Sequence, residues 1–284
     1  MSDIKHFFIT GCASGIAKHL TGVLLRQGHR VFATDVNPSA LEQAARDNAW
    51  PEDRVRLRAL DVRDADAWEE VFGAAAGEFG HIDVCMNIAG LLLAAWATEQ
   101  PINEVHSQID VNVKGVIFGT RAAARHMAPR GKGHIVNIAS IAGLTPVPGM
   151  AVYAASKYAV RAYSLSVNLE LRKKGVYVVA ICPASVQTPM LDGQLYNDAA
   201  DLFYSGYRML TVEEIEHAIL HRALRRKPPY EVHIPRLKTK LAKLADIIPA
   251  MWPVFEPLYK RSGRRRQAQR RTGGKQGPSG KSNG

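Results

Sequence analysis

A tyrosine and a lysine four residues apart, Tyr153 and Lys157, are the residues of this sequence whose types and spacing could do chemistry. Four residues along a helix bring two side chains to one face. The lysine ammonium would favour the phenolate, so we expect the pKa of Tyr153 to fall from about 10 toward the working pH. A phenol tuned in this way can act as a general acid or base. The same spacing is common among ordinary surface neighbours, so the surrounding elements decide its meaning.

A glycine-containing turn near the N-terminus could hold a phosphate. The segment 10–17, Thr-Gly-Cys-Ala-Ser-Gly-Ile-Ala, follows a short apolar run and precedes a helical pattern that ends near Gly28. Glycine has no Cβ, so the backbone N–H groups of such a turn can approach a pyrophosphate at the helix N-terminus. Ala17 takes the last small position, which this fingerprint tolerates. The alternative is a tight turn that binds no ligand.

An acidic residue follows at a distance that suits a nucleotide. Asp35 ends a second apolar run and lies 20 residues after Gly15. A carboxylate there accepts hydrogen bonds from the adenosine ribose hydroxyls and repels a 2′-phosphate. No Arg or Lys directly follows Asp35, and Ser14 rather than a basic residue precedes Gly15. The sequence therefore predicts NAD(H) as the cofactor in preference to NADP(H).

Seven short apolar runs along the chain have the length and composition of strands. They are residues 6–10, 30–35, 55–60, 81–86, 134–140, 176–182 and 230–234. Helical patterns separate them, and the runs are nearly continuous in apolar residues, which indicates parallel strands buried on both faces. The sequence therefore predicts an α/β fold, a single Rossmann-type doubly wound domain over residues 1–235. Its seven-stranded parallel sheet would carry helices on both faces.

Further polar residues stand at the ends of these runs and between them. Asn87-Ile-Ala-Gly90 follows the fourth run, Asn112 lies in a helical region, and Ser140 closes the fifth run. Together with the glycine turn, Asp35, Tyr153 and Lys157, and in this order, they resemble the NAD-dependent short-chain dehydrogenases/reductases over residues 4–235. Each motif alone is weak, but the ordered set is specific.

The resemblance implies a hydride transfer between NAD(H) and a secondary alcohol or ketone. In such a site Tyr153 exchanges a proton with the substrate oxygen, and Ser140 hydrogen-bonds that oxygen. Lys157 holds the nicotinamide ribose and lowers the pKa of Tyr153. Asn112 holds a water that links Lys157 to solvent.

The resemblance also implies a set of residues that contact the cofactor, in which Tyr153 and Lys157 take part. The others are Gly11, Ser14, Gly15 and Ile16 at the pyrophosphate, Asp35 at the ribose, Asp61 and Val62 at the adenine, Asn87, Ala89 and Gly90 along the adenosine side, and Val186 and Thr188 at the carboxamide. One departure is visible, because Ala184 replaces a glycine of the family after the sixth run. Asn87 could instead be a turn residue that bonds its own backbone, and Asn112 could simply kink its helix.

Apolar residues dominate the loops expected over the nicotinamide. They are Leu91, Leu92, Leu93, Trp96, Leu144, Val147, Pro148, Met150, Met190, Leu191, Leu195, Tyr196, Phe203 and Tyr204. Such a lining suits a bulky lipophilic alcohol or ketone of steroid, retinoid or long-chain type better than a sugar. The alternatives are that half of these residues are core, that the substrate is a small polar alcohol or sugar, or that the protein is a non-catalytic NAD-sensing module.

Charge and cysteine usage limit the remaining classes. Nine basic residues follow Glu256 without an acidic one, and they account for all but +2 of the net charge of +11. The body therefore gives no sign of a nucleic-acid surface. Three well-separated cysteines in apolar surroundings indicate buried thiols and a reducing compartment. With no signal peptide or membrane span in the sequence, we expect a cytoplasmic protein. His217 and His221 lack a third ligand, so no metal site is expected.

The C-terminal part departs from the family. Apolar residues repeat at helical spacing with lysines between them in the segment 236–259, and a basic tail of residues 260–284, expected to be disordered, follows. A basic amphipathic helix and polybasic tail could contact an anionic inner membrane surface. The alternative is a helix packed on its own domain beside a solvated tail. The tail lacks interleaved aromatic residues, so no specific nucleic acid is expected. The resemblance implies a homodimer or homotetramer.

Overall fold

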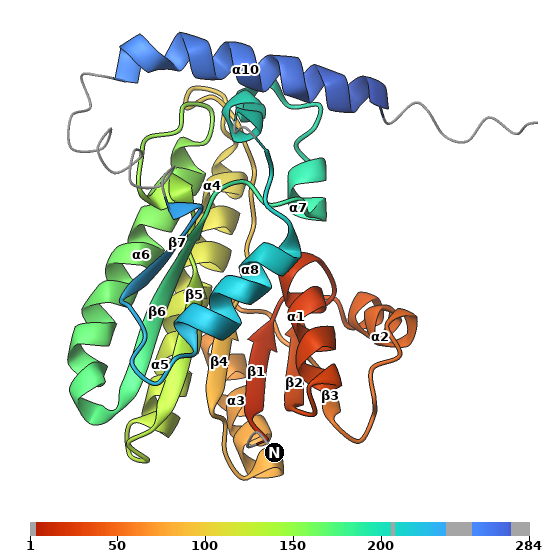
Figure 1. Cartoon of the computed structure of the whole chain (residues 1–284), viewed down its shortest axis with the longest axis vertical. Helices are drawn as coiled ribbons and strands as arrows, with labels where there is room; N and C mark the ends of the chain where they lie inside the picture. Colours follow the sequence, from red (N-terminus) through yellow and green to blue (C-terminus); the bar gives the residue numbers. More distant parts are fainter. Residues whose placement is uncertain (1–3, 206–207, 237–251, 274–284) are drawn as a thin grey trace, which may run out of the picture.

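A computed structural model describes residues 4–205, 208–236 and 252–273 of the chain (Figure 1). Its centre is a parallel sheet of seven strands in the order β3-β2-β1-β4-β5-β6-β7. The strands are β1 (His6–Thr10), β2 (Arg30–Asp35), β3 (Val55–Ala59), β4 (Val84–Asn87), β5 (Gly133–Ile138), β6 (Val176–Pro183) and β7 (Glu231–Ile234). This arrangement confirms the predicted doubly wound α/β fold.

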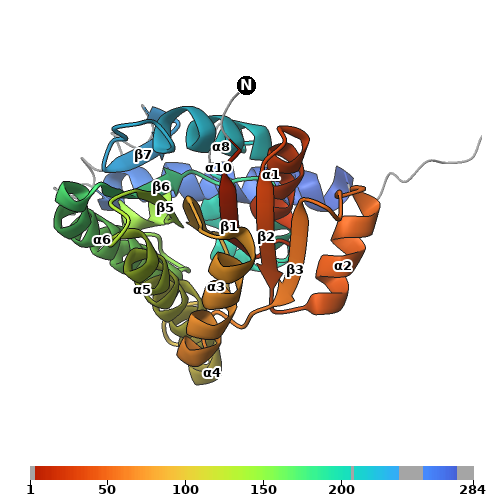
Figure 2. The same ribbon diagram turned by 90° about the horizontal axis from the view of Figure 1, so that it is seen from below.

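The chain has nine named helices in the described residues, and several of them cover the two faces of the sheet. They are α1 (Gly15–Arg26), α2 (Pro38–Asp47), α3 (Ala65–Phe79), α4 (Ile102–Ile109), α5 (Gly115–Met127), α6 (Ala151–Leu171), α7 (Pro189–Asp192), α8 (Val212–Ala218) and α10 (Trp252–Gly273). Figure 2 shows α3, α4, α5 and α6 on one side of the sheet and α1 and α8 on the other. Shorter helical turns complete the list: η1 (Asp110–Lys114), η2 (Ile141–Gly143), η3 (Arg172–Lys174), η4 (Asp198–Tyr204) and η5 (Ile219–Ala223).

The two faces of the sheet carry separate hydrophobic cores because side chains alternate along a strand. In β1, Phe7 and Ile9 pack with α1 and α8, whereas Phe8 packs with Trp68 and Phe72 of α3. All of these side chains are buried. The apolar runs of the sequence are nearly continuous because both faces are covered.

Local sequence signals set the ends of several helices. Asn37 accepts a hydrogen bond from the backbone N–H of Ala40 and caps α2, with Pro38 in its first turn. Thr211 and Glu214 form the capping box of α8. The strand order reverses between β1 and β4, and this opens a crevice at the carboxyl ends of the strands. The fold therefore brings the carboxyl ends of the strands together at one edge of the sheet, where the site lies.

The C-terminal region differs in part from its prediction. The helical repeat expected between residues 237 and 248 lies outside the described residues. Residues 260–273, predicted to belong to a disordered tail, are helical within α10 and pack on η4. Polar side chains of α10 find partners in residues 194–201, and this packing stabilises a helix that would be marginal in isolation. Among the described helices, none combines the length and apolarity that crossing a membrane requires.

Candidate active site

One cleft at the carboxyl ends of the strands collects most of the residues singled out in the sequence. It has a volume of about 420 Å³. The predicted residues in its lining are Gly11, Ser14, Gly15, Ile16, Asp35, Asp61, Val62, Ala89, Gly90, Ser140, Tyr153, Lys157, Val186 and Thr188. Segments that follow β1, β2, β4, β5 and β6 therefore meet around one space, as the topology of a doubly wound sheet requires.

The glycine turn between β1 and α1 has the geometry of a phosphate cradle. Gly11 has a φ of +80° and Gly15 a φ of +54°, conformations that favour glycine. A Cβ on Gly11 would lie 3.0 Å from the Cα of Ala89, so a side chain there would push the turn away from the loop after β4. α1 begins at Gly15 beside the cleft and has no acidic residue in its first turn. The turn thus fits a dinucleotide pyrophosphate at a helix N-terminus.

Asp35, the last residue of β2, and Asp61, which follows β3, also line the cleft. The carboxylate of Asp35 accepts hydrogen bonds from the backbone N–H groups of Ala13 and Asn37, each at 3.0 Å. It is therefore fixed between the glycine turn and α2. Asp61 forms an ion pair with Arg63 at 2.6 Å, and the hydrogen bonds from Arg63 lower the pKa of the Asp61 carboxyl. Arg63 also lines the cleft, and the sequence analysis did not select it.

The predicted catalytic pair lies on α6, with both side chains buried. The Lys157 ammonium donates a hydrogen bond of 2.9 Å to the backbone oxygen of Ile138 and lies 5.6 Å from the centroid of the Tyr153 ring. Ser140 follows β5 and its Oγ accepts from the N–H of Ala142 at 3.1 Å. Its hydroxyl also interacts with the Tyr153 phenol and acts to lower the pKa of that group. A phenol, a hydroxyl and an ammonium thus share the cleft with the glycine turn.

The pKa of Tyr153 differs from the value expected from its lysine neighbour. Burial raises it to about 12, because the phenolate would be removed from water, and the hydrogen bond with Ser140 offsets only part of the rise. Burial lowers the pKa of Lys157 to about 8 for the same reason. Desolvation outweighs the pairing of the two groups, and the ammonium is directed to Ile138. The predicted fall in the pKa of Tyr153 is therefore corrected to a rise.

Asn112 is held by side-chain hydrogen bonds between two elements of the site. It lies in η1, a π-helical turn between α4 and α5, and is fully buried. Its Oδ1 accepts from the N–H of Leu91 at 2.7 Å, while its Nδ2 donates to the oxygen of Leu91 at 2.8 Å and to Ser156 Oγ at 3.0 Å. The amide therefore holds the loop after β4. A Cβ on Gly90 would lie 3.4 Å from Asn112 Oδ1 and 3.7 Å from Lys157 Nζ, so both side chains approach Gly90.

Asn87 lies outside the lining of the cleft. It is the last residue of β4, and its Nδ2 donates to Asn137 Oδ1 at 2.8 Å and to Thr120 Oγ1 at 3.3 Å. This buried network joins β4 and β5 to α5, so Asn87 holds the sheet where it was expected to border the cofactor. Ile88 takes the place in the lining. Thr10 fixes this loop by accepting from the N–H groups of Ile88 and Ala89, each at 3.1 Å.

The apolar loop residues divide between lining and core. Leu91, Met190, Leu191 and Phe203 line the cleft, and the Phe203 ring lies 6.2 Å from that of Tyr153. Others are buried within the loops. They are Leu92, Leu144, Met150 and Tyr204. Of the fourteen residues predicted to form the lining, four therefore line the cleft and these four others are core.

Comparisons with known proteins agree with this geometry. Residues 5–198 match the model of the short chain dehydrogenase family. An uncharacterized oxidoreductase of Staphylococcus aureus strain N315 is 32% identical over 213 residues, which cover 75% of this chain and 88% of its own length. A closed form of serine dehydrogenase complexed with NADP+ is 30% identical, with a TM-score of 0.73 over 80% of this chain and 93% of its own. ElxO with NADP bound is 24% identical and has a TM-score of 0.74 over 82% and 97%, a likeness of fold. The chain belongs to the short-chain dehydrogenase/reductase family, as an oxidoreductase that uses a nicotinamide dinucleotide.

Proposed function

We propose that this protein transfers a hydride between NAD(H) and a bulky, lipophilic secondary alcohol or ketone. The observation that carries the proposal is the common cleft that Tyr153, Lys157, the glycine turn and Asp35 line. A turn for the pyrophosphate and an acid for the ribose fix the direction in which a dinucleotide would lie. Its nicotinamide end would then come to the phenol.

Tyr153 supplies the proton. With a pKa of about 12 its phenol stays protonated at neutral pH, so it can donate to the carbonyl oxygen of a ketone that accepts the hydride. Ser140 holds the same oxygen through its hydroxyl and fixes the orientation of the phenol. The bound nicotinamide supplies the hydride chemistry, and the chain supplies position and field. In the reverse direction the phenolate must form first, and a positive charge on Lys157 beside it favours that form.

The preference for NAD over NADP rests on Asp35. Its carboxylate is fixed by two backbone donors and borders the cleft, so a 2′-phosphate on the ribose would meet a negative charge. The neighbouring cation Arg63 is already paired with Asp61 through Nε and Nη2, which satisfies much of its donor capacity. This arrangement supports NAD here although structural relatives were solved with NADP.

The lipophilic substrate class rests on the lining beside Tyr153. Leu91, Met190, Leu191 and Phe203 give the cleft apolar surface, and Leu191 and Phe203 pack in one cluster with Tyr153. Ser140 and Tyr153 would supply the polar contacts for one substrate oxygen. A polyol would leave several hydroxyl groups without partners in such a pocket, at about 1–3 kcal/mol for each buried group. A sterol or a long-chain secondary alcohol would present one.

The substitution Tyr153→Phe tests the proposal. It removes the phenolic hydroxyl and keeps the ring, so NADH affinity should change less than about twofold, while turnover should fall at least about hundredfold because the proton donor is lost. The assay follows the absorbance of the reduced cofactor with a 3-hydroxysteroid, 2-decanol, cyclohexanol and sorbitol. Tyr163→Phe on the same helix, whose hydroxyl contacts Ile117 and not the cleft, is the matched control. Turnover above a few per cent of wild type in Tyr153→Phe would contradict the assigned role.

A further inference from the structure

Helix α10 lies across the side of the molecule to which the strands point (Figure 1). It packs on η4, the turn that ends the segment 189–204 between β6 and α8. That segment carries Met190, Leu191 and Phe203 to the lining of the cleft. None of the lining residues that the structure describes belongs to α10. The helix therefore contacts the outside of a wall of the cleft.

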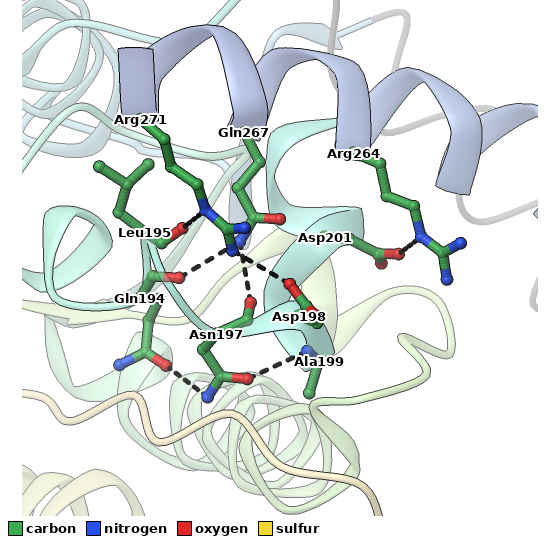
Figure 3. Close-up of polar contacts among 9 residues, drawn as sticks. All are labelled: Gln194, Leu195, Asn197, Asp198, Ala199, Asp201, Arg264, Gln267 and Arg271. Atoms are coloured by element: carbon green, nitrogen blue, oxygen red, sulfur yellow. Dashed lines mark hydrogen bonds and ion pairs between the residues drawn. The ribbon is translucent and has the colours of Figure 1, made fainter. Parts of the chain in front are cut away.

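Three polar side chains fasten α10 to that wall (Figure 3). Gln267 is buried, and its Nε2 donates to the backbone oxygens of Asn197 at 2.8 Å and Gln194 at 3.4 Å. Arg271 donates from Nε to the oxygen of Leu195 at 2.8 Å. The oxygens of Gln194 and Asn197 also accept from the backbone N–H groups of Asn197 and Ala200, so Gln267 attaches α10 to carbonyl groups that already hold turns of the segment.

The ion pairs of α10 use the acidic residues of the same segment. Arg264 pairs with Asp201 at 3.1 Å and Arg271 pairs with Asp198 at 3.0 Å. The Asp201 side chain is fully buried, so it depends on Arg264 for compensation of its charge. The Asp198 side chain is exposed, and its pair contributes little. Arg264 and Asp201 therefore form the ion pair that matters most for this contact.

A glycine allows the close approach of the two elements. A Cβ added to Gly263 would collide with the backbone oxygen of Asp201 and lie 2.8 Å from its carbonyl carbon. Glycine within a helix destabilises it by roughly 1 kcal/mol relative to alanine. Glycine at position 263 therefore weakens the helix but permits its contact with η4. This indicates that the sequence favours packing of α10 on η4.

Side chains of the fastened segment reach the next loop of the cleft. Gln194 donates from Nε2 to the oxygen of Leu92 at 3.1 Å and accepts from the N–H of Ala94 at 3.3 Å. Asn197 donates to the oxygen of Ala94 at 2.5 Å. Gln194 and Asn197 thus connect α10 to the loop that begins with Leu91, which also lines the cleft. One helix holds two walls of the substrate side.

We propose that α10 is a positioning element for the substrate, and that Gly263, Arg264, Gln267 and Arg271 are its positioning residues. They hold the segment 189–204 and the loop after β4 in place beside Tyr153. Loss of the contact should raise the KM of the alcohol and leave cofactor affinity unchanged, since the glycine turn and Asp35 lie elsewhere in the cleft. The consequence for KM rests on the proposed function, whereas the contact itself does not.

The substitution Gly263→Ala in the full-length chain tests this inference. Alanine strengthens the helix by its propensity but blocks docking on Asp201, so the two effects have opposite signs. Hydrogen exchange of the amides in 189–204 should rise at least about tenfold, as expected of a segment released to open locally. With the best alcohol of the panel KM should also rise at least about tenfold, while the Kd of NADH stays within about twofold. Arg265→Ala, an exposed neighbour on α10, is the matched control and should change none of these.

A double-mutant cycle separates this role from general destabilisation. Arg264→Ala leaves the buried Asp201 carboxylate unpaired and should accelerate exchange and raise KM, whereas adding Asp201→Asn removes that charge and should recover part of both effects. Unchanged exchange in Gly263→Ala would overturn the inference, as would faster exchange with an unchanged KM. A wild-type protein that turned over no alcohol of the panel would contradict the proposed function instead, and exchange would still decide whether α10 holds the wall.

Discussion

Burial gives Tyr153 and Lys157 the same tendency, because each is driven toward its neutral form. The phenol has its pKa raised to about 12 and the ammonium has its pKa lowered to about 8. A neutral phenol suits proton donation, and a lysine that gives up its proton so readily is poised to respond to charge nearby. Both shifts arise because the two groups are removed from water, and a charge brought into the site would change both pKa values.

The lowered pKa of Lys157 has a consequence for stability. Below pH 8 the amine is charged in both the folded and unfolded chains, so its burial penalty is constant. Between about pH 8 and 10.5 the unfolded chain binds more protons than the folded one, and the free energy of unfolding therefore rises with pH through this window. Relative to Lys157→Met, the wild type should gain on the order of 3 kcal/mol across it. Urea unfolding of both proteins without cofactor, at intervals from pH 7 to 11, measures the difference. Parallel pH profiles would show that the amine is solvated.

In the proposed function, Asp35 is the residue that should decide between the two nicotinamide dinucleotides. Asp35→Asn keeps the size of the side chain and an acceptor for Ala13 or Asn37, but removes the charge that repels a 2′-phosphate. We expect kcat/KM with NAD to fall about tenfold or more, through loss of charged hydrogen bonds to the ribose, and the NADP/NAD ratio to rise at least about tenfold.

Asp53→Asn serves as the control for that experiment, since it removes an exposed carboxylate away from the cleft. Steady-state kinetics with both cofactors at fixed alcohol give the ratio. A ratio unchanged by Asp35→Asn would move the determinant of cofactor choice elsewhere in the cleft.

The sequence identifies residues at strand ends better than it identifies the direction of their side chains. Asp35, Ser140 and the glycine turn could be placed because the topology of a parallel sheet brings strand ends together. The hydrogen-bond partners of Asn87 and Asn112 could not be predicted, because a side-chain amide can hydrogen-bond a ligand or the backbone equally well. Their partners, Asn137 and Leu91, are 50 and 21 residues away along the chain. The pKa of Tyr153 was missed for a similar reason, because burial is a property of the folded surroundings.

At the scale of elements, α5 approaches β4 and α3 where a glycine is required. A Cβ on Gly119 would collide with Asn87 Oδ1 and lie 2.5 Å from Cη2 of Trp68. Gly119→Ala should therefore destabilise the fold by about 1–3 kcal/mol, since the packed neighbours must move. The same substitution at Gly73, an exposed position of α3 with no atom within 4 Å of its Cβ, should stabilise by roughly 0.5–1 kcal/mol. Urea unfolding of both variants should show changes of opposite sign in the free energy of unfolding, and equal changes would refute the close approach.

Local signals explain which elements could be predicted. The caps at Asn37 and Thr211 are encoded within four residues, and the structure has both. α10 was missed because an arginine-rich segment looks solvated when its acidic partners, such as Asp201, lie about sixty residues earlier. The π-helical turn at Asn112 lies where the residue could have kinked its helix, but its form depends on tertiary hydrogen bonds to Leu91 and Ser156. Elements held by distant partners are the ones that the pattern of the sequence does not disclose.

At the scale of the whole molecule, positive charge is concentrated on one helix. Three arginines of α10, Arg264, Arg270 and Arg271, pair with acids of residues 192–201. Arg261 and Arg265 are exposed. The paired arginines of α10 therefore bind acidic residues of the same chain. An anionic surface would instead contact the exposed Arg261 and Arg265. We propose that α10 can contact such a surface while it stays docked.

The contact should be electrostatic and should need no undocking of α10. Full-length protein should co-sediment with vesicles of phosphatidylcholine and phosphatidylglycerol at low ionic strength. It should not do so with phosphatidylcholine alone, and the binding should be lost near 1 M salt, where the screening length is about 3 Å. At roughly 1 kcal/mol for each basic residue near the surface, Arg261→Gln with Arg265→Gln should weaken partitioning about thirtyfold. The KM of the alcohol should stay unchanged in that variant, because neither arginine fastens the wall of the cleft. Equal sedimentation with neutral vesicles, or a double variant that binds as the wild type does, would show that the exposed arginines are simply solvated.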